Sequence, residues 1–401
     1  MKVLVVHNRY RSFTPSGENV VVDADIAALR DRGVDVVTYI RASDEIEEWP
    51  RAKRISLGLL PLYSPAALRA VRDLIRREQP DLMHLHNPFP LVSPAVVRVA
   101  AKASLPVVQS VHNHRLVCVK GTFFRDGKVC RDCLGKTVPW PAVAHGCYQN
   151  SSLRSIPMAT ALAVHRGTAQ LVDRYLALTP QMRDHLLAAG IHADRITVRP
   201  NTVTDPKDSD LGGGAGFLFA GRFSEEKGIA LLAAAWRQHP DGSLGTMTIA
   251  GHGPLRSTVD ALTADRSDVR FVGQLDEAAM AAAIRAAAVV VVPSTCPEAF
   301  PRIVVEALSH GRPVLATALG GLPGIVTEEV GVLVSPDADS LAAGLARIPS
   351  LDLPQVRLQA RERYEILYSP DVVYTQLLEV YADVIGHPRA PASAQDESGH
   401  R

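Results

Sequence analysis

The chain has 401 residues, which is too long for a single ordinary core and indicates two domains. Hydrophobic residues make up 47% of it and charged residues 21%, the balance of a globular enzyme, and no apolar run approaches the roughly 18 residues that span a bilayer. The apolar run near the start is only four residues long, too short for a secretory signal, so we expect a cytoplasmic protein.

The net charge of +1 conceals two halves of opposite sign. Residues 1–200 contain 27 Lys and Arg against 17 Asp and Glu, whereas residues 201–401 contain 16 against 25. The basic half favours an anionic partner, such as a phosphorylated acceptor, an acidic membrane surface or nucleic acid. The pattern is equally compatible with charge spread thinly over a large domain.

Short apolar runs alternate with helical patterns from one end of the chain to the other. In the first half the runs are KVLVV, VDVVTYI, DLMHLH, PVVQSVH, RYLALT and RITVRPN; in the second they are GFLFAGR, GTMTIAGHG, VRFVG, VVVVPS, RPVLATA and VGVLVSP. This alternation predicts parallel sheets covered by helices on both faces, and hence two doubly wound α/β domains.

Composition places the boundaries of these domains. The predicted parts are a first domain (1–203) with a cysteine-rich insertion (115–150), a linker (204–216), a second domain (217–369), a final helix (370–386) and a tail (387–401). Asp, Ser and Gly accumulate in the linker, and the tail of Pro, Ala, Ser and charged residues is predicted to be disordered. The final helix follows a complete domain and can pack back across the first one.

Polar residues follow three strands of the first half. They are Gly17, Glu18 and Asn19 at a helix start, and the repeated pairs His86–Asn87 and His112–Asn113. Ligands of parallel sheets bind beyond the carboxyl ends of the strands, so these residues are candidates for a cleft. Helix initiation and structural histidines are the alternatives.

Four of the five cysteines fall within 30 residues. They are Cys118, Cys130, Cys133 and Cys147, and they include one C-x2-C pair. In a reducing compartment such a cluster favours a structural zinc site over disulfides, with free thiols as the alternative. The fifth, Cys296, is expected to be an ordinary buried thiol.

Two motifs of the second half fit a nucleotide. Arg222 and Lys227 lie at a strand-to-helix turn, where the helix start already favours a diphosphate, although solvated surface cations are the alternative. Gly251 and Gly253 form a turn that permits close backbone approach. That turn lacks the third glycine of a dinucleotide fingerprint, so it favours a dehydrogenase only weakly.

A third motif places Glu298 and Glu306 eight residues apart across a strand-to-helix junction. We expect Pro301 at the first helical position. Both carboxylates can then reach the edge of the sheet. For Glu306 the alternative is a surface pair with Arg302, and for Glu298 it is stabilisation of the helix dipole.

Taken together, the order G-R-F-S-x-E-K-G, G-x-G-P and E-x7-E resembles the retaining glycosyltransferases of family 4. The resemblance covers nearly the whole chain. It implies the GT-B fold, in which two Rossmann-like domains face each other across a cleft and a C-terminal helix crosses back to the first domain. The donor would be a UDP- or GDP-linked sugar and the acceptor a glycan or a lipid-linked molecule.

The resemblance also implies roles for individual residues. Arg222 and Lys227 would bind the diphosphate, Glu298 the sugar hydroxyls and Glu306 the ribose, while Gly251, Gly253, Phe300 and Arg302 would complete the donor site. His112 falls where an active-site histidine is expected, so His112 and Glu298 are the predicted catalytic pair. Gly17, Glu18, Asn19, His86, Asn87 and Asn113 would line the acceptor side of the cleft.

No catalytic metal is expected, because each Asp-x-Asp triplet has an ordinary explanation in a helix, a linker or a cap. Arg51, Lys53 and Arg54 beside LGLLPLY predict weak contact with an anionic membrane. Two alternatives remain: a nucleotide-sugar epimerase on the same plan, and a zinc-bearing nucleic-acid binder. The second lacks interleaved aromatic residues and a C-x2-C…H-x3-H pattern.

Overall fold

The computed structural model describes residues 1–12, 16–206 and 211–387. The predicted tail therefore lies outside the described residues except for His387, as do residues 207–210 of the predicted linker. Within the described ranges, every helix is too short or too polar to span a bilayer.

The first half is built on a parallel six-stranded sheet with the order β2-β1-β3-β4-β7-β8. Its strands are β1 (Lys2–Arg9), β2 (Asp35–Ala42), β3 (Leu82–Leu85), β4 (Val107–Val111), β7 (Arg174–Ala177) and β8 (Ile196–Val198). Its main helices are α1 (Gly17–Asp31), α2 (Arg51–Ile55), α3 (Pro65–Glu78), α4 (Val96–Lys102), α6 (Ser152–Val164), α7 (Arg166–Ala169) and α8 (Pro180–Ala188).

Helices cover both faces of this sheet, which is why its central strands are mostly apolar and are buried on both sides. Side chains alternate along β1: Val3 and Val5 pack with α1, whereas Leu4 and Val6 belong to the cluster that contains α3 and α4. Every residue of β3 and β4 is buried. The prediction of a doubly wound domain is confirmed for this half.

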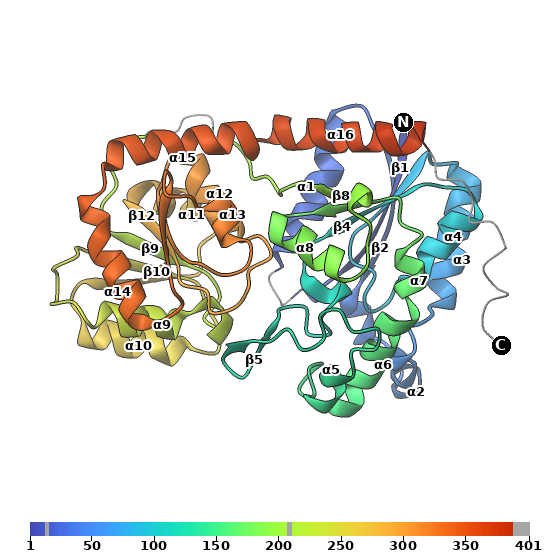
Figure 1. Ribbon diagram of the computed structural model, residues 1–401, viewed down its shortest axis with the longest axis horizontal. Helices are drawn as coiled ribbons and strands as arrows, with labels where there is room; N and C mark the ends of the chain where they lie inside the picture. Colours follow the sequence, from blue (N-terminus) through green and yellow to red (C-terminus); the bar gives the residue numbers. More distant parts are fainter. Residues whose placement is uncertain (13–15, 207–210, 388–401) are drawn as a thin grey trace.

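The insertion between β4 and β7 contains little regular structure. It has a short antiparallel hairpin of β5 (Phe124–Arg125) and β6 (Lys128–Val129), and the small helix α5 (Trp140–Ala144). The hairpin projects from the first domain toward the second (Figure 1).

The second half carries another parallel six-stranded sheet, with the order β11-β10-β9-β12-β13-β14. Its strands are β9 (Phe217–Ala220), β10 (Met247–Ala250), β11 (Val269–Gly273), β12 (Val289–Val292), β13 (Val314–Thr317) and β14 (Gly331–Val334). Its helices are α9 (Ile229–Trp236), α10 (Arg256–Asp265), α11 (Glu277–Ala286), α12 (Arg302–Ser309), α13 (Leu322–Ile325) and α14 (Ala338–Arg347). The strand order reverses between β9 and β12, and in such sheets ligands bind outside the strand ends at that point.

The last two helices, α15 (Leu353–Leu367) and α16 (Pro370–Gly386), run along one side of both domains (Figure 1). The side chains of Leu377 and Tyr381 on α16 join the core of the first domain beside α1. Arg199, only 1% exposed, pairs with Asp25 of α1 at 3.3 Å and donates a hydrogen bond to the carbonyl of Val373. The predicted return of the last helix to the first domain is therefore confirmed.

Candidate active site

In the second domain, the segments after β9 and β12 meet at the point where the strand order reverses. Lys227 lies in the short helix η5 (Glu225–Lys227) after β9, and its Nζ is 2.7 Å from Oε1 of Glu298, which follows β12. The hydroxyl of Ser294 donates to the same carboxylate oxygen at 2.6 Å. Arg222 is exposed on the same loop. The sequence had placed Lys227 and Glu298 in one site, but not in direct contact.

Backbone contacts hold these two loops together. The carbonyls of Glu225 and Glu226 accept hydrogen bonds from the hydroxyl and the amide of Thr295, at 2.7 and 3.0 Å. Gly228 has a φ of +70°, and a Cβ placed there would lie 1.7 Å from the carbonyl oxygen of Pro293. Only glycine allows this approach, so the start of α9 is fixed against the end of β12.

Gly251 and Gly253 also permit a close approach, but to protein backbone. A Cβ on Gly251 would lie 1.9 Å from the carbonyl oxygen of Gly221, and one on Gly253 would lie 2.6 Å from the amide nitrogen of Phe223. The turn after β10 is thus packed against the loop that carries Arg222. This close backbone contact by itself requires glycine at both positions, whether or not a ligand also approaches them.

The start of α12 differs from the expectation in detail. Pro301 is the residue before the helix, with extended ψ, and not its first helical residue. Phe300 is 9% exposed and its ring packs against Tyr368, so any donor contact at Phe300 would come from its backbone. Arg302 pairs with Glu306 at 3.2 Å, as the surface-pair alternative anticipated. Burial raises the pKa of Glu306, and Arg302 acts against that rise.

In the first domain, the residues that follow β3 and β4 line one small polar pocket together with the start of α1. The predicted residues among its lining are Glu18, His86, Asn87, His112 and Asn113. Four buried polar atoms around it have no hydrogen-bond partner within the described part of the chain: Oε1 of Glu18, Nε2 of His86, Nδ1 of His112 and Nε of Arg115. Unpaired buried polar atoms are costly, so these atoms are available to a ligand.

Glu18 is the acidic group of this pocket. Its Oε2 accepts hydrogen bonds from the hydroxyl of Tyr10 and the side-chain amide of Asn113, both at 3.2 Å. Burial raises the pKa of Glu18 to about 7, and Arg115 opposes the rise. Glu18 can therefore gain or lose a proton near neutral pH, a property that its position at a helix start did not reveal.

The histidines of the pocket form a connected group. Nε2 of His112 lies 2.9 Å from Nδ1 of His86, and their rings are stacked. Burial lowers the pKa of His112 to about 3, with His7 as the next cause. His112 is thus a neutral hydrogen-bonding group. Asn19 accepts a hydrogen bond from Nε2 of His7 at 3.1 Å when that nitrogen is protonated, and Asn87 lies on the other side of the same ring.

The two half-sites face each other across the domain boundary. A Cβ on Gly17, at the start of α1, would lie 3.6 Å from Cδ of Arg302 at the start of α12. Further along the boundary, Gly321 after β13 lies against Thr179, the residue that caps α8. The carboxyl edges of the two sheets therefore meet at one cleft, with the loops of Lys227 and Glu298 on one side and the polar pocket on the other.

The four clustered cysteines lie apart from this cleft pocket. All four line a separate small cavity inside the insertion, while Cys296 is a buried thiol next to the Glu298 turn.

Four residues of the site escaped the sequence analysis: His7, Tyr10, Arg115 and Ser294. Tyr10 directly follows β1 and Ser294 is the second residue after β12, so the rule that pointed to the other strand ends applied to them as well. His7 lies inside β1 and Arg115 in the short 3-10 helix His114–Leu116, and only the folded chain brings them beside His86 and Glu18.

Comparison with known proteins agrees with this geometry. The family model for a glycosyl transferase 4-like domain matches residues 16–202, and the model for glycosyl transferases group 1 matches residues 214–350. The phosphatidyl-myo-inositol mannosyltransferase of Mycobacterium tuberculosis is 35% identical over 342 residues, covering 81% of this chain and 79% of that protein. The chain therefore belongs to the group 1 glycosyltransferases of family 4.

Solved structures support the same fold. Sucrose-phosphate synthase from Thermosynechococcus elongatus aligns over 96% of this chain and 99% of its own, with a TM-score of 0.69 and 21% identity. HepE from Anabaena in complex with UDP covers 96% of this chain and 100% of its own, with a TM-score of 0.64 and 18% identity. The predicted GT-B fold is confirmed, and glycosyl transfer is supported over the epimerase alternative.

Proposed function

We propose that the chain transfers a sugar from a nucleotide diphosphate sugar to an acceptor hydroxyl with retention of the anomeric configuration, as part of cell-envelope glycan or glycolipid synthesis. The observation that carries the proposal is the meeting of Lys227 with Glu298 at the strand-order reversal of the second sheet, opposite the His112 pocket of the first. Cations and carboxylates at such a place suit a diphosphate and sugar hydroxyls.

On the donor side, Arg222 and Lys227 would hold the diphosphate, Glu298 the sugar hydroxyls and Glu306 the ribose. The HepE structures with UDP and with UDP-glucose support a nucleotide-sugar donor on this fold. Both UDP and GDP remain candidates for the nucleotide.

The transfer would proceed on one face of the sugar. The bond from the anomeric carbon to the diphosphate oxygen breaks, the acceptor oxygen forms the new bond, and the acceptor proton passes to the leaving diphosphate. Lys227 and Arg222 would stabilise the charge that develops on the leaving group. His112, neutral because of its burial, would orient the sugar by a hydrogen bond from its free Nδ1 side.

A lipid-linked acceptor is the candidate that the surface favours. Leu59 is 65% exposed and Leu153 is 79% exposed, and the segments that carry them lie together, since a Cβ placed on Gly58 would be 3.4 Å from Cγ of Pro157. The exposed cations beside these residues are Arg51, Lys53, Arg54 and Arg154. Exposed apolar side chains among cations suit the surface of an anionic bilayer. The name of the mycobacterial relative also contains a lipid acceptor, phosphatidyl-myo-inositol.

A donor screen tests the proposal. UDP- and GDP-linked sugars are added singly to the full chain, and the midpoint of thermal unfolding is measured, because a ligand that binds only the folded state raises it. The sugar that stabilises the protein is then incubated with glycan and lipid acceptors, and the product is analysed. A raised midpoint followed by a product of retained configuration supports the proposal. Stabilisation by none of the donors, or an inverted product, contradicts it.

A further inference from the structure

The insertion of residues 115–150 needs a source of order other than regular structure. Its β-strands are two residues long and its one α-helix has five residues. Segments of this size usually depend on a metal or disulfides, and the five cysteines of the chain are free thiols.

The thiols of the insertion gather around one cavity. Its lining includes Cys118, Cys130, Cys133, Cys147 and His145, together with the cations Lys120 and Arg125. Backbone turns present two of the cysteines: the carbonyl of Cys118 accepts a hydrogen bond from Gly121, and that of Cys133 accepts one from Lys136. The arrangement brings Cys118 and Cys147, 29 positions apart in the sequence, to the same small cavity.

We propose that this cavity binds one zinc ion through Cys118, Cys130, Cys133 and Cys147, and that the ion holds the hairpin β5–β6 in place. Zinc with four thiolates is the usual closed structural site, and it carries a net charge of −2. Lys120 and Arg125 line the cavity and offset that charge.

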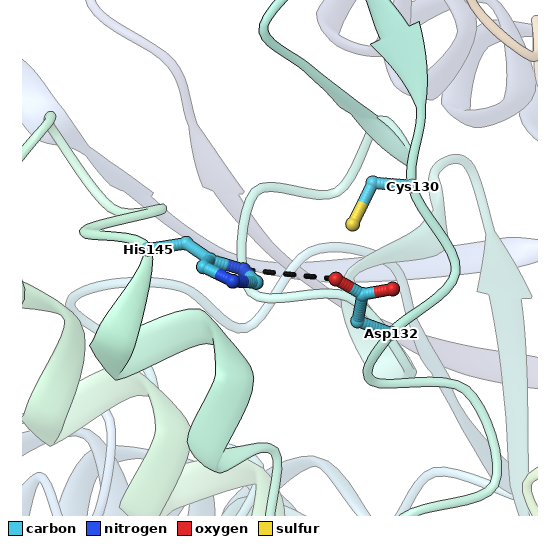
Figure 2. Close-up of side chains that lie close together, drawn as sticks. All are labelled: Cys130, Asp132 and His145. Atoms are coloured by element: carbon cyan, nitrogen blue, oxygen red, sulfur yellow. Dashed lines mark ion pairs between the residues drawn. The ribbon is translucent and has the colours of Figure 1, made fainter.

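A second set of possible ligands shares Cys130 with the first and adds Asp132 and His145, and Figure 2 shows these three side chains. The ligand atoms of Cys130, Asp132 and His145 are within 4.8 Å of one another, and among the described residues they form the one group of three that is this close. The four sulfurs are not all within this distance of one another, so side chains of the cavity wall must move to bring them onto one ion. Asp132 and His145 are exposed and pair with each other at 3.8 Å. We assign them to the surroundings of the ion, because the four thiols supply a complete set.

The ion would support the donor loop across the domain boundary. The amide of Cys130 donates to the carbonyl of Phe123 at 2.7 Å, at the base of the hairpin. Asp126 and Gly127, with φ of 51° and 72°, form the tight turn at its tip. A Cβ on Gly127 would lie 3.1 Å from Oε1 of Glu225, the first residue of the short helix that ends with Lys227. The zinc site thereby connects the insertion to the loop of Lys227.

Metal content tests the site directly. Full-length protein purified without chelator should contain about one equivalent of zinc by elemental analysis, and Cys133→Ser should lose it. Cys296→Ser is the matched control, since Cys296 lies outside the insertion, and it should keep the metal. Less than about a tenth of an equivalent in the wild type, or full retention by Cys133→Ser, overturns the proposal.

Two further measurements do not depend on the folding of a cysteine variant. Titration of the wild type with a mercurial thiol reagent should release the zinc, detected with a chromogenic chelator. His145→Ala and Asp132→Ala should keep the metal; its loss from either variant would overturn the four-thiol set in favour of the Cys130, Asp132 and His145 group.

The effect on the hairpin is tested by limited proteolysis. Lys128 in the hairpin and Arg131 beside it are exposed trypsin sites. Removal of zinc by a chelator should speed cleavage at these two sites severalfold in the full chain, while cleavage elsewhere changes little. An unchanged rate at both sites would show that the ion does not hold the hairpin. This readout is independent of the proposed transferase function.

Discussion

Nζ of Lys227 lies 2.7 Å from Oε1 of Glu298. This ion pair joins the loop after β9 to the loop after β12. Burial alone would lower the pKa of Lys227, but the attraction of Glu298 outweighs it and the pKa is raised. Lys227 is therefore a cation at every pH at which the protein is handled. Its partner also fixes the position of the ammonium group, so the proposed binding of a diphosphate there would cost little side-chain order.

Lys227→Ala should weaken nucleotide binding. Its removal eliminates one charged hydrogen bond to the diphosphate, which corresponds to about 1.5 to 3 kcal/mol of binding free energy. Titration calorimetry with the nucleotide that stabilises the wild type measures the change. The matched control is Arg237→Ala, which removes a cation of the same domain from an exposed pair with Asp265 and should leave the affinity unaltered. Equal affinity in the wild type and Lys227→Ala would refute the assignment.

Gly228→Ala should disrupt the donor loop through its backbone. The added Cβ would lie 1.7 Å from the carbonyl oxygen of Pro293, a distance that forces the two loops apart. We expect nucleotide affinity to fall at least about tenfold, or 1.4 kcal/mol. Gly242→Ala is the control, because Gly242 also has a positive φ, of 75°, but no atom lies within 4 Å of the added Cβ. If both variants bind nucleotide equally well, the glycine contact does not shape the site.

Sequence reasoning placed the loops of the proposed donor site at one edge of the sheet, because strand ends can be read from apolar runs and those of parallel strands share one edge. The pair of Lys227 with Glu298 could not be read in the same way, since the two residues are 71 positions apart and meet only because β9 and β12 are neighbours in the sheet. The roles of Gly251 and Gly253 were hidden for a similar reason. Their tight contacts are with Gly221 and Phe223, and only the folded chain shows them.

The first domain gave a weaker basis for prediction. The strand-end rule found His86 and His112, but burial sets their chemistry, and a sequence does not reveal the depth of a pocket. Glu18 illustrates the difference. The sequence placed it at a helix start beside the predicted cleft without indicating its depth, whereas Tyr10 and Asn113 enclose it and burial raises its pKa to about 7.

Glu18→Gln should change how stability depends on pH. Because the pKa of Glu18 is raised to about 7 by burial, the stability it contributes is fully present below the unfolded value of about 4.3 and is lost as the pH rises through 7. Glutamine keeps an oxygen acceptor for Tyr10 and Asn113 but does not titrate. The melting temperature of the variant relative to the wild type should therefore rise between pH 5 and pH 8. The rise should be about 2 to 4 °C for each kcal/mol of unfolding free energy that the wild type loses over this range.

The control for this measurement is Glu47→Gln, which alters an exposed carboxylate paired with Arg11. The difference in melting temperature between Glu47→Gln and the wild type should stay nearly constant over the same pH range. A constant difference for Glu18→Gln as well would mean that Glu18 is not held in a buried, proton-binding state.

The exposed apolar side chains near α2 should bind anionic bilayers. Leu59→Ser combined with Leu153→Ser should reduce cosedimentation with phosphatidylglycerol vesicles severalfold, and binding of the wild type should weaken as salt rises, because exposed charges are screened beyond about 8 Å at physiological ionic strength. Leu358→Ser with Ile366→Ser is the matched control, since it removes two exposed apolar side chains from α15. Equal losses in both double variants, or no binding of the wild type at low salt, would contradict this surface.

His112 gives the sharpest test of the chemistry. Its ring is held by His86, and its pKa of about 3 keeps it neutral, so it can position a sugar hydroxyl but cannot supply a cation. Its loss should misplace the donor sugar, and small misplacements are costly for a reacting pair. We expect His112→Ala to lower turnover by about a hundredfold while nucleotide affinity changes little. If the wild-type rate changes between pH 5 and pH 8, the rate of His112→Ala should change over the same pH range.

The control for His112 is another buried histidine of the same domain. His165 bonds to Thr168 and to backbone carbonyls, and burial likewise lowers its pKa, but it does not line the pocket of Glu18 and His112. His165→Ala should therefore keep most of the turnover of the folded enzyme. The anomeric configuration of the product separates two failures: an inverted product would overturn retention, whereas a retained product from a fully active His112→Ala would overturn only the role of His112.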